Sequence, residues 1–269
     1  MLLFSNAKIN LGLRVVEKRP DGYHNIETIM IPLGFADLLE FTDDGSQEVT
    51  YTNTGLQVNC AENENLVIKA YHLIREDFNI PGISIHLHKF IPPGAGLGGG
   101  SSNGAYMLRG LNEHFNLGLD DYRLEKYAAM LGSDCPLFIR NTPCLASGRG
   151  EKLINIQLPL KFYLVLLYPG FPVSTGEAYK GIIPHKEEIS LTEVLKINPD
   201  NWKNTLKNQF EDTVFSLYPR LQILKSSLYN HGAFYASMTG SGSAVYGLFR
   251  EKPALSKELE EIRIWEGEV

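Results

Sequence analysis

The stretch with the clearest chemical meaning is IPPGAGLGGGSSNGA, at residues 91–105. Five of the seven positions from 94 to 100 are glycine, and Ser101 and Ser102 follow. An alternating strand pattern precedes the stretch and a helical pattern follows it, so we expect a connection from strand to helix. Backbone N–H groups and the positive dipole at a helix start bind anions, and serine hydroxyls add hydrogen-bond donors. The sequence therefore predicts a phosphate-binding loop.

Two common phosphate-binding patterns match this loop only in part. The glycine spacing from Gly94 to Gly99 fits a Walker loop, but Gly100 stands where the lysine belongs. Gly94, Gly96 and Gly99 satisfy the dinucleotide pattern, yet the expected acidic residue, at 120–121, falls at a predicted helix start. A flexible surface turn is also disfavoured, because the loop leads directly into an amphipathic helix. An anion site at a helix start remains the best interpretation.

Other motifs carry polar or aromatic residues with two possible meanings. Lys8 and Asn10 alternate with apolar residues in a predicted strand, so they share a polar face. The residues alone favour an exposed lysine on an edge strand. Asp134 follows a predicted helix end, where capping of the next turn is an equally good explanation. Tyr23 and His24 follow an Asp-Gly turn, where simple packing would account for them.

Hydrophobic periodicity predicts the elements that must position these residues. Strands are expected at 8–16, near 26–33, at 83–90, at 162–168 and on both sides of 238–243. Helices are expected at 63–78, 101–115 and 120–131, and before and after Pro219. SGRGEK at 147–152 predicts a hairpin, and Ser174–Glu177 and Ser190–Glu193 predict capping boxes.

Strands and helices are interleaved without regular alternation, which favours an α+β fold in two domains. We place the boundary so that the domains span 1–155 and 156–269.

Composition narrows the function classes further. The 269 residues carry a net charge of −6, which argues against a nucleic-acid surface. No apolar run is long enough for a membrane span. Three cysteines, in no metal-ligand spacing, predict reduced thiols in a cytoplasmic protein. No dedicated metal site is predicted, and nothing in the sequence indicates an oligomeric state.

Three stretches together resemble the GHMP small-molecule kinases. They are AKINLGLRVVEKRPDGYHNIETIM near the start, PPGAGLGGGSSNGA in the middle and MTGSGSAVYGLF near the end. The first is similar to one branch in particular, which acts on 4-diphosphocytidyl-2-C-methyl-D-erythritol in the non-mevalonate isoprenoid pathway. The resemblance therefore covers essentially the whole chain.

This resemblance implies a fold and a reaction. The amino-terminal domain would resemble the second domain of ribosomal protein S5, and the carboxy-terminal domain would be ferredoxin-like. The kinase would use ATP and magnesium (Mg2+) to phosphorylate the 2-hydroxyl of its cytidine-linked substrate. The ATP-binding residues implied are Pro92, Pro93, Gly94, Ala95, Gly96, Leu97, Gly98, Gly99, Gly100, Ser101 and Ser102.

The resemblance also assigns catalytic roles. Lys8 in AKINL and Asp134 in GSDCP match the catalytic pair of the family. Asp134 would accept or orient the proton of the substrate hydroxyl. Lys8 would hold that carboxylate ionised and stabilise the developing charge.

Substrate binding is implied for five further residues. Tyr23 would stack on the cytosine ring and His24 would bind its polar edge, while Asn10 would place the methylerythritol hydroxyls. Tyr179, with Thr175 nearby, would form a second aromatic wall. The match is loose there, because the family usually has a proline at the position after the threonine.

Three rival functions remain. Another GHMP kinase, acting on homoserine or a mevalonate-type alcohol, would have no use for the cytosine-binding motif RPDGYH. A nucleotide-binding protein without turnover is disfavoured because Lys8 and Asp134 are both present. Nucleic-acid binding would rest on analogy to ribosomal protein S5 alone.

Overall fold

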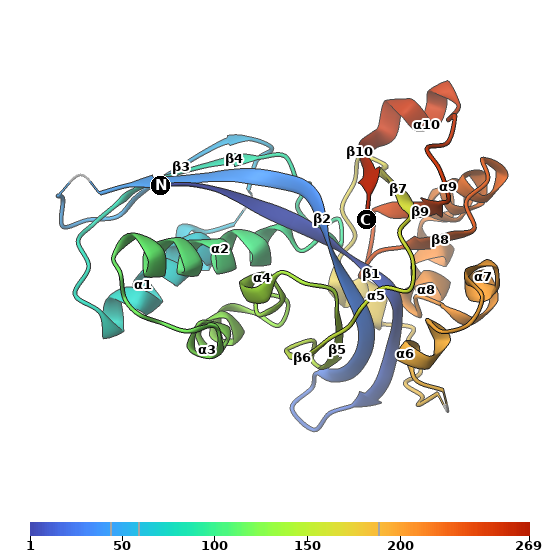
Figure 1. Ribbon diagram of the computed structural model, residues 1–269, viewed down its shortest axis with the longest axis horizontal. Coiled ribbons are helices and arrows are strands. Elements are labelled where there is room, and N and C mark those ends of the chain that lie inside the picture. Colours follow the sequence, from blue (N-terminus) through green and yellow to red (C-terminus); the bar gives the residue numbers. More distant parts are fainter. Residues whose placement is uncertain (44, 59, 188) are drawn as a thin grey trace. The chain divides into compact units, whose positions relative to one another are not determined.

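Two long strands, β1 (Leu2–Lys18) and β2 (His24–Thr42), organise the fold of the computed structural model (Figure 1). The structure describes residues 1–43, 45–58, 60–187 and 189–269. Both strands pass from one compact unit of the chain into another, so each unit is assembled from separate segments. Unit 1 comprises Met1–Lys8, Pro32–Pro93 and Gly98–Thr142, and unit 2 comprises Ile9–Ile31, Gly94–Leu97 and Pro143–Val269. The division into domains at residue 155 stays a prediction.

Unit 1 combines a sheet with helices on one side of it (Figure 1). The second half of β2 pairs antiparallel with β4, and β4 pairs parallel with β3. The glycine loop connects β4 to α2. The remaining elements of unit 1 are β3 (Thr50–Gly55), β4 (Ser84–Lys89), η1 (Glu62–Glu64), α1 (Leu66–Asp77), α2 (Gly99–His114), α3 (Asp121–Leu131) and α4 (Leu137–Arg140).

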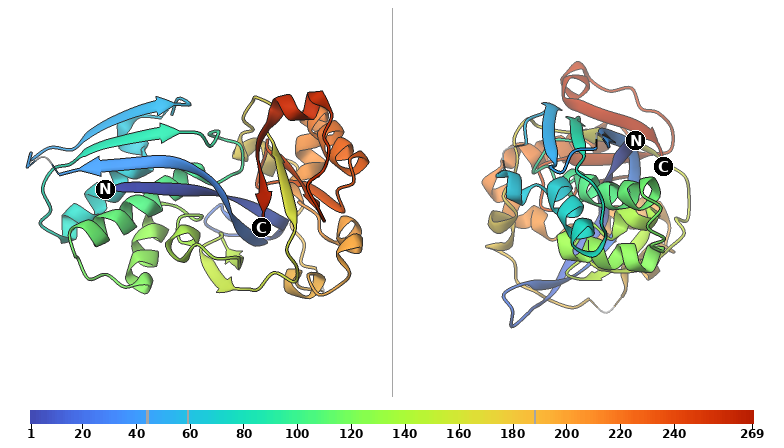
Figure 2. Two further views of the ribbon diagram at one scale, coloured as in Figure 1. Left: turned by 45° about the horizontal axis from the view of Figure 1, so that its top comes forward. Right: turned by 90° about the vertical axis from the view of Figure 1, so that its left-hand side faces the viewer.

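Unit 2 contains an antiparallel sheet in the order β10-β7-β9-β8 and a hairpin, β5-β6, that pairs with the first half of β2. Apolar residues of α8 and α9 pack with those of β7 and β9 in one core, so the two helices cover one face of the sheet (Figure 2). The strands are β5 (Cys144–Gly148), β6 (Lys152–Asn155), β7 (Tyr163–Leu167), β8 (Tyr235–Met238), β9 (Val245–Phe249) and β10 (Arg263–Glu268). The helices are α5 (Thr175–Tyr179), α6 (Leu191–Val194), η2 (Pro199–Asn201), α7 (Trp202–Thr205), α8 (Phe210–Leu217), α9 (Pro219–Asn230) and α10 (Lys257–Ile262).

Most predicted elements are confirmed. The helices at 63–78, 101–115 and 120–131 correspond to α1, α2 and α3, and the Asp120 side chain caps α3 as expected. The hairpin at 147–152 is the β5-β6 connection. The Ser190–Glu193 capping box is formed.

Two predictions about local structure are wrong. The Ser174 side chain makes no capping bond, and the Glu177 carboxylate accepts a hydrogen bond from the Tyr218 hydroxyl at 3.3 Å. The second strand is also much longer than the predicted range 26–33, since its pairing partner changes from β5 to β4 along its length.

In the described part of the chain, no helix has both the length and the apolar character that a membrane crossing requires.

Candidate active site

Lys8 and Asp134 form an ion pair inside unit 1. Lys8 Nζ lies 3.4 Å from Asp134 Oδ2, and their side chains are 4% and 30% exposed. The prediction of an exposed lysine on an edge strand is therefore wrong, because β1 is buried on both faces at this point. Asp134 is also not a helix cap, since Pro136 occupies the cap position of α4. The Lys8 side chain is therefore buried, whereas the Asp134 side chain is partly exposed.

The start of α2 lies against Lys8. Gly98 occupies the cap position with φ of +70°, and no side chain caps the helix. A Cβ on Gly98 would approach Lys8 Cγ and Cε to 3.1 Å. Glycine thus allows both the backbone turn and the contact with Lys8. Because no side chain caps this helix start, its first N–H groups remain available as donors to a ligand.

Two serines of the first turn of α2 differ in their surroundings. Ser101 hydrogen-bonds with the thiol of Cys135, and burial raises the pKa of Cys135 to about 12. Ser102 is fully buried, and its hydroxyl has no hydrogen-bond partner among the described residues. Gly100 is exposed, and a Cβ there would meet nothing within 4 Å. An unpartnered hydroxyl and an uncapped helix fit a phosphate group.

A buried carboxylate that the sequence did not reveal fixes the entry to the loop. Asp37 is fully buried, and its Oδ1 accepts the N–H groups of Phe90 and Ile91, both at 2.8 Å. Its Oδ2 accepts the Asn103 side chain at 2.9 Å and forms an ion pair with Lys89. Burial lowers the pKa of Lys89, and Asp37 opposes that shift. No local pattern marks Asp37, because its partners come from the end of β4, the two residues after it, and α2.

The first part of the loop, Gly94–Leu97, belongs to unit 2. Gly96 has φ of +77°, and a Cβ there would lie 2.1 Å from the Thr239 carbonyl oxygen. The Thr239 hydroxyl donates to the Gly96 carbonyl at 3.2 Å, and the Ala244 N–H donates to Ala95 at 3.1 Å. The glycine-rich segment around residue 240 therefore packs directly on this part of the loop. Of the two prolines that precede it, Pro92 is buried and Pro93 is exposed.

Asn10 lies in the same unit, 2% exposed. Its backbone N–H donates to the Thr239 hydroxyl at 3.0 Å, and its side-chain amide donates to the Thr28 hydroxyl at 3.0 Å. The amide oxygen accepts a hydrogen bond from Thr239 at 3.3 Å. Asn10 thus links β1 to β2 and to the Thr239 segment. Its contact with substrate hydroxyls stays a prediction.

The aromatic residues predicted to bind a base also lie in unit 2. Tyr23 is 57% exposed, and the guanidinium carbon of Arg149 lies 4.7 Å from its ring centroid. The His24 and Tyr179 rings stack with centroids 4.7 Å apart, and Tyr179 packs edge-on against Phe210. The fold thus brings His24 and Tyr179 together from distant segments. Arg149 was missed, although the GRG sequence of its hairpin marks a tight turn.

Thr175 is the first residue of α5. Its hydroxyl lies 3.1 Å from the hydroxyl of Ser241, in the glycine-rich segment that packs on the loop. In the described part of the chain, no group of three or more His, Cys, Asp or Glu residues is arranged to hold a metal ion.

Comparison with known proteins identifies the family. The family models for the GHMP kinase N-terminal and C-terminal domains match residues 65–141 and 186–265. A Bacteroides fragilis protein named 4-diphosphocytidyl-2-C-methyl-D-erythritol kinase is 48% identical over 96% of this chain and 95% of its own. The chain belongs to this family of GHMP kinases. A kinase of the same name from Parabacteroides distasonis is 46% identical over the whole length of both chains.

Solved structures agree with the family and the fold. A crystal structure of 4-(cytidine 5'-diphospho)-2C-methyl-D-erythritol kinase matches with a TM-score of 0.76 and 32% identity, over 92% of this chain and 90% of the other. The Methanococcus jannaschii mevalonate kinase shares the fold, with a TM-score of 0.68 and 18% identity over 97% and 92% of the two chains. The predicted α+β GHMP kinase fold is confirmed.

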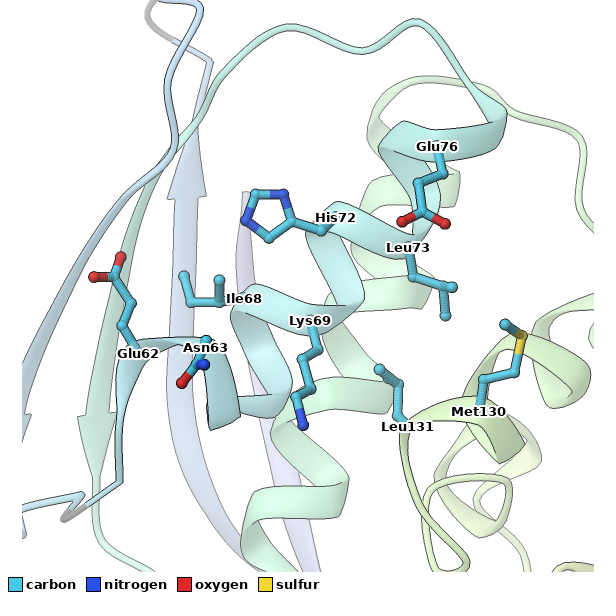
Figure 3. Close-up of a pocket in the computed structure, with 9 residues that line it drawn as sticks. All are labelled: Glu62, Asn63, Ile68, Lys69, His72, Leu73, Glu76, Met130 and Leu131. Carbon is cyan, nitrogen blue, oxygen red and sulfur yellow. The ribbon is translucent and has the colours of Figure 1, made fainter.

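A pocket of about 610 Å³ lies elsewhere in unit 1, beside α1 and the end of α3 (Figure 3). Leu73, Met130 and Leu131 line one side of it, and Glu62 and His72 lie across α1 from them. None of the predicted site residues lines this pocket.

Proposed function

We propose that this chain transfers the γ-phosphoryl group of ATP to the 2-hydroxyl of 4-diphosphocytidyl-2-C-methyl-D-erythritol. The products would be the 2-phosphate and ADP, and the reaction belongs to the methylerythritol phosphate pathway to isopentenyl diphosphate. The observation that carries the reaction type is the Lys8–Asp134 pair beside the uncapped start of α2. The relatives of the same name support the choice of substrate.

The chemistry asked of the protein is mainly positioning and charge neutralisation, as in other phosphoryl transfers. Asp134, the more exposed member of the pair, accepts or orients the proton of the acceptor hydroxyl. The Lys8 ammonium lies 3.4 Å from that carboxylate, and the Lys8 side chain runs past Gly98 at the start of α2, so the ammonium would stabilise negative charge on the transferred group. The α2 start, with Ser101 and Ser102, holds phosphate oxygens. ATP supplies the phosphoryl group when bound.

We propose that magnesium enters with the nucleotide and not as a resident ion. Magnesium in kinases is usually held by substrate phosphates, waters and one or two protein oxygens. The described residues offer no cluster of acidic side chains for it. The candidate protein oxygens for it are those of Asp134, Ser101 and Ser102.

Base recognition would use the exposed aromatic residues of unit 2. Tyr23 offers a partly exposed ring for stacking on cytosine, and His24 offers ring nitrogens for its polar edge. Tyr179 contacts His24 directly, so a base held between Tyr23 and Tyr179 would have to displace His24 from that stack. Thr175 and Asn10 would contact the remainder of the substrate.

The cellular setting is part of the same proposal. Cys60, Cys135 and Cys144 are free thiols, of which only Cys60 is exposed. Free thiols suit a reducing compartment, so we place the enzyme in the cytoplasm. Its partner is a small molecule, neither nucleic acid nor membrane.

A phosphoryl-transfer assay tests the function. Purified protein with magnesium and ATP would be given either the cytidylated substrate or the corresponding methylerythritol phosphate without cytidine. We expect ADP release only with the cytidylated substrate. Equal turnover of both compounds would contradict base recognition, and ATP binding without any turnover would indicate a nucleotide-binding protein that lacks the reaction.

A further inference from the structure

Sheet register brings Arg149 next to Tyr23. β5 pairs antiparallel with β2, and Gly148 is opposite Ile26. The residue after Gly148 therefore lies beside the beginning of β2, which Tyr23 precedes. The guanidinium carbon of Arg149 is 4.7 Å from the Tyr23 ring centroid, within the range of a cation–π interaction.

The hairpin turn holds Arg149 in this place. Gly148 and Gly150, on either side of it, have φ of +71° and +116°. The Arg149 N–H donates to Glu151 Oε2 at 2.7 Å, and a Cβ on Gly148 would come within 2.8 Å of the same carboxylate. Only glycine fits this turn, so the backbone of Arg149 is fixed by its own hairpin.

The turn that carries Tyr23 is fixed independently. The Tyr23 N–H donates to Asp21 Oδ1 at 3.1 Å, and the Tyr23 carbonyl accepts the Arg19 N–H at 2.8 Å. The Arg19 side chain pairs with Asp21 at 2.8 Å. Within the described ranges Arg149 forms no ion pair. The Arg19 side chain, and to a smaller extent the charge of Arg149, lower the pKa of Asp21, so the guanidinium lies over the ring and near this carboxylate. With Arg149 over its ring, Tyr23 is still 57% exposed.

We propose that Arg149 is a positioning residue for the base: its guanidinium supports one face of Tyr23 and leaves the other face for cytosine. The inference rests on the proposed function, because it takes cytosine as the ligand. A planar guanidinium stacks on an aromatic ring, and a ring held in its binding orientation loses less freedom when the ligand arrives. An exposed cation–π contact corresponds to a change in affinity of about two- to fivefold.

The test measures binding of cytidine 5'-diphosphate to the full chain by titration calorimetry. The variants are Arg149→Ala and Arg149→Lys. The matched control is Arg250→Ala, because Arg250 also lies over an aromatic ring, 5.4 Å from the centroid of Phe234 in the same unit. We expect Arg149→Ala to weaken binding about two- to fivefold, Arg149→Lys to weaken it less, and the control to bind as the parent chain does.

A double-variant experiment distinguishes two roles of Arg149: support of the Tyr23 ring, or direct contact with the phosphates of the nucleotide. In a chain with Tyr23→Leu, Arg149→Ala should cause no further loss, because the supported ring is gone. In turnover, Arg149→Ala should raise the KM for the cytidylated substrate and leave kcat and the KM for ATP unchanged.

Three results would overturn the proposal. Unchanged or tighter binding by Arg149→Ala overturns it. If the parent chain still turns over the cytidylated substrate, the proposed function stands. A full additional loss in the Tyr23→Leu background also overturns it. A parent chain that neither binds the nucleotide nor phosphorylates the substrate overturns both proposals together.

Discussion

Gly96 in the glycine loop and Gly22 in the turn before Tyr23 share a left-handed backbone but not their surroundings. A Cβ on Gly96 would lie 2.1 Å from a carbonyl oxygen, whereas a Cβ on Gly22 would have no atom within 4 Å. The functional side chains nearby differ in the same way: the Lys8 side chain is 4% exposed and Tyr23 is 57% exposed. The glycine loop and the Lys8–Asp134 pair are fixed by packing from distant segments, and the turn is fixed by its own neighbours. We therefore expect changes in the first region to affect kcat or folding, and changes in the second to affect KM.

The largest effect should come from Asp134→Asn. The amide keeps the shape of the side chain but cannot accept the hydroxyl proton, so kcat should fall about 10²- to 10⁴-fold. The KM for ATP and the melting temperature should change little. Steady-state kinetics measure kcat and KM, and a thermal melt gives the melting temperature. A variant that keeps more than a tenth of kcat would contradict a role for Asp134 in the chemistry.

The next effect concerns stability. Gly96→Ala adds a left-handed non-glycine residue and a clash with Thr239, so it should lower the free energy of unfolding by roughly 3 kcal/mol or more. Gly22 has φ of +85°, and a Cβ there would meet no atom within 4 Å. Gly22→Ala should therefore lower the free energy of unfolding only by the cost of the left-handed backbone, about 1–2 kcal/mol. Urea unfolding measures both variants. If both variants lost the same free energy of unfolding, the close packing around Gly96 would not distinguish the two regions.

A smaller effect is expected for Tyr23→Leu. Loss of base stacking should raise the KM for the cytidylated substrate by about 5- to 150-fold and leave kcat near the parent value. Tyr23→Phe keeps the ring and serves as the control. If Tyr23→Leu lowered kcat and left KM unchanged, the turn would belong to the catalytic region and the comparison would fail.

The smallest effect is expected from thiol alkylation at pH 8. Cys135 is buried beside Asp134 with its pKa raised to about 12, so roughly one thiol in 10⁴ is ionised at this pH. Iodoacetamide should therefore label exposed Cys60 with no change in rate. Peptide mass spectrometry gives the sites. Labelling of Cys135 in the folded chain would show that the catalytic region opens more readily than its packing indicates.

Local sequence patterns determined much of the fold. Helix α3, with its Asp120 cap, the β5-β6 hairpin and the strand-to-helix loop all follow from periodicity and turn residues. These features depend on near neighbours, so a short window of sequence contains their physical cause. The capping box predicted at Ser174 is not formed, and the Glu177 carboxylate bonds instead with Tyr218, which is distant in the sequence.

Tertiary structure alone decided which site residues meet. The contact of Lys8 with Asp134, the stack of His24 on Tyr179 and the packing of Arg149 on Tyr23 join segments far apart in the chain. Family resemblance suggested the first contact, but no spacing in the sequence required it. Strand register and core packing set these distances, and both depend on the whole chain. The sequence by itself therefore determined the elements and the family motifs, and the folded chain decided that Lys8 is buried and that Tyr23 is exposed.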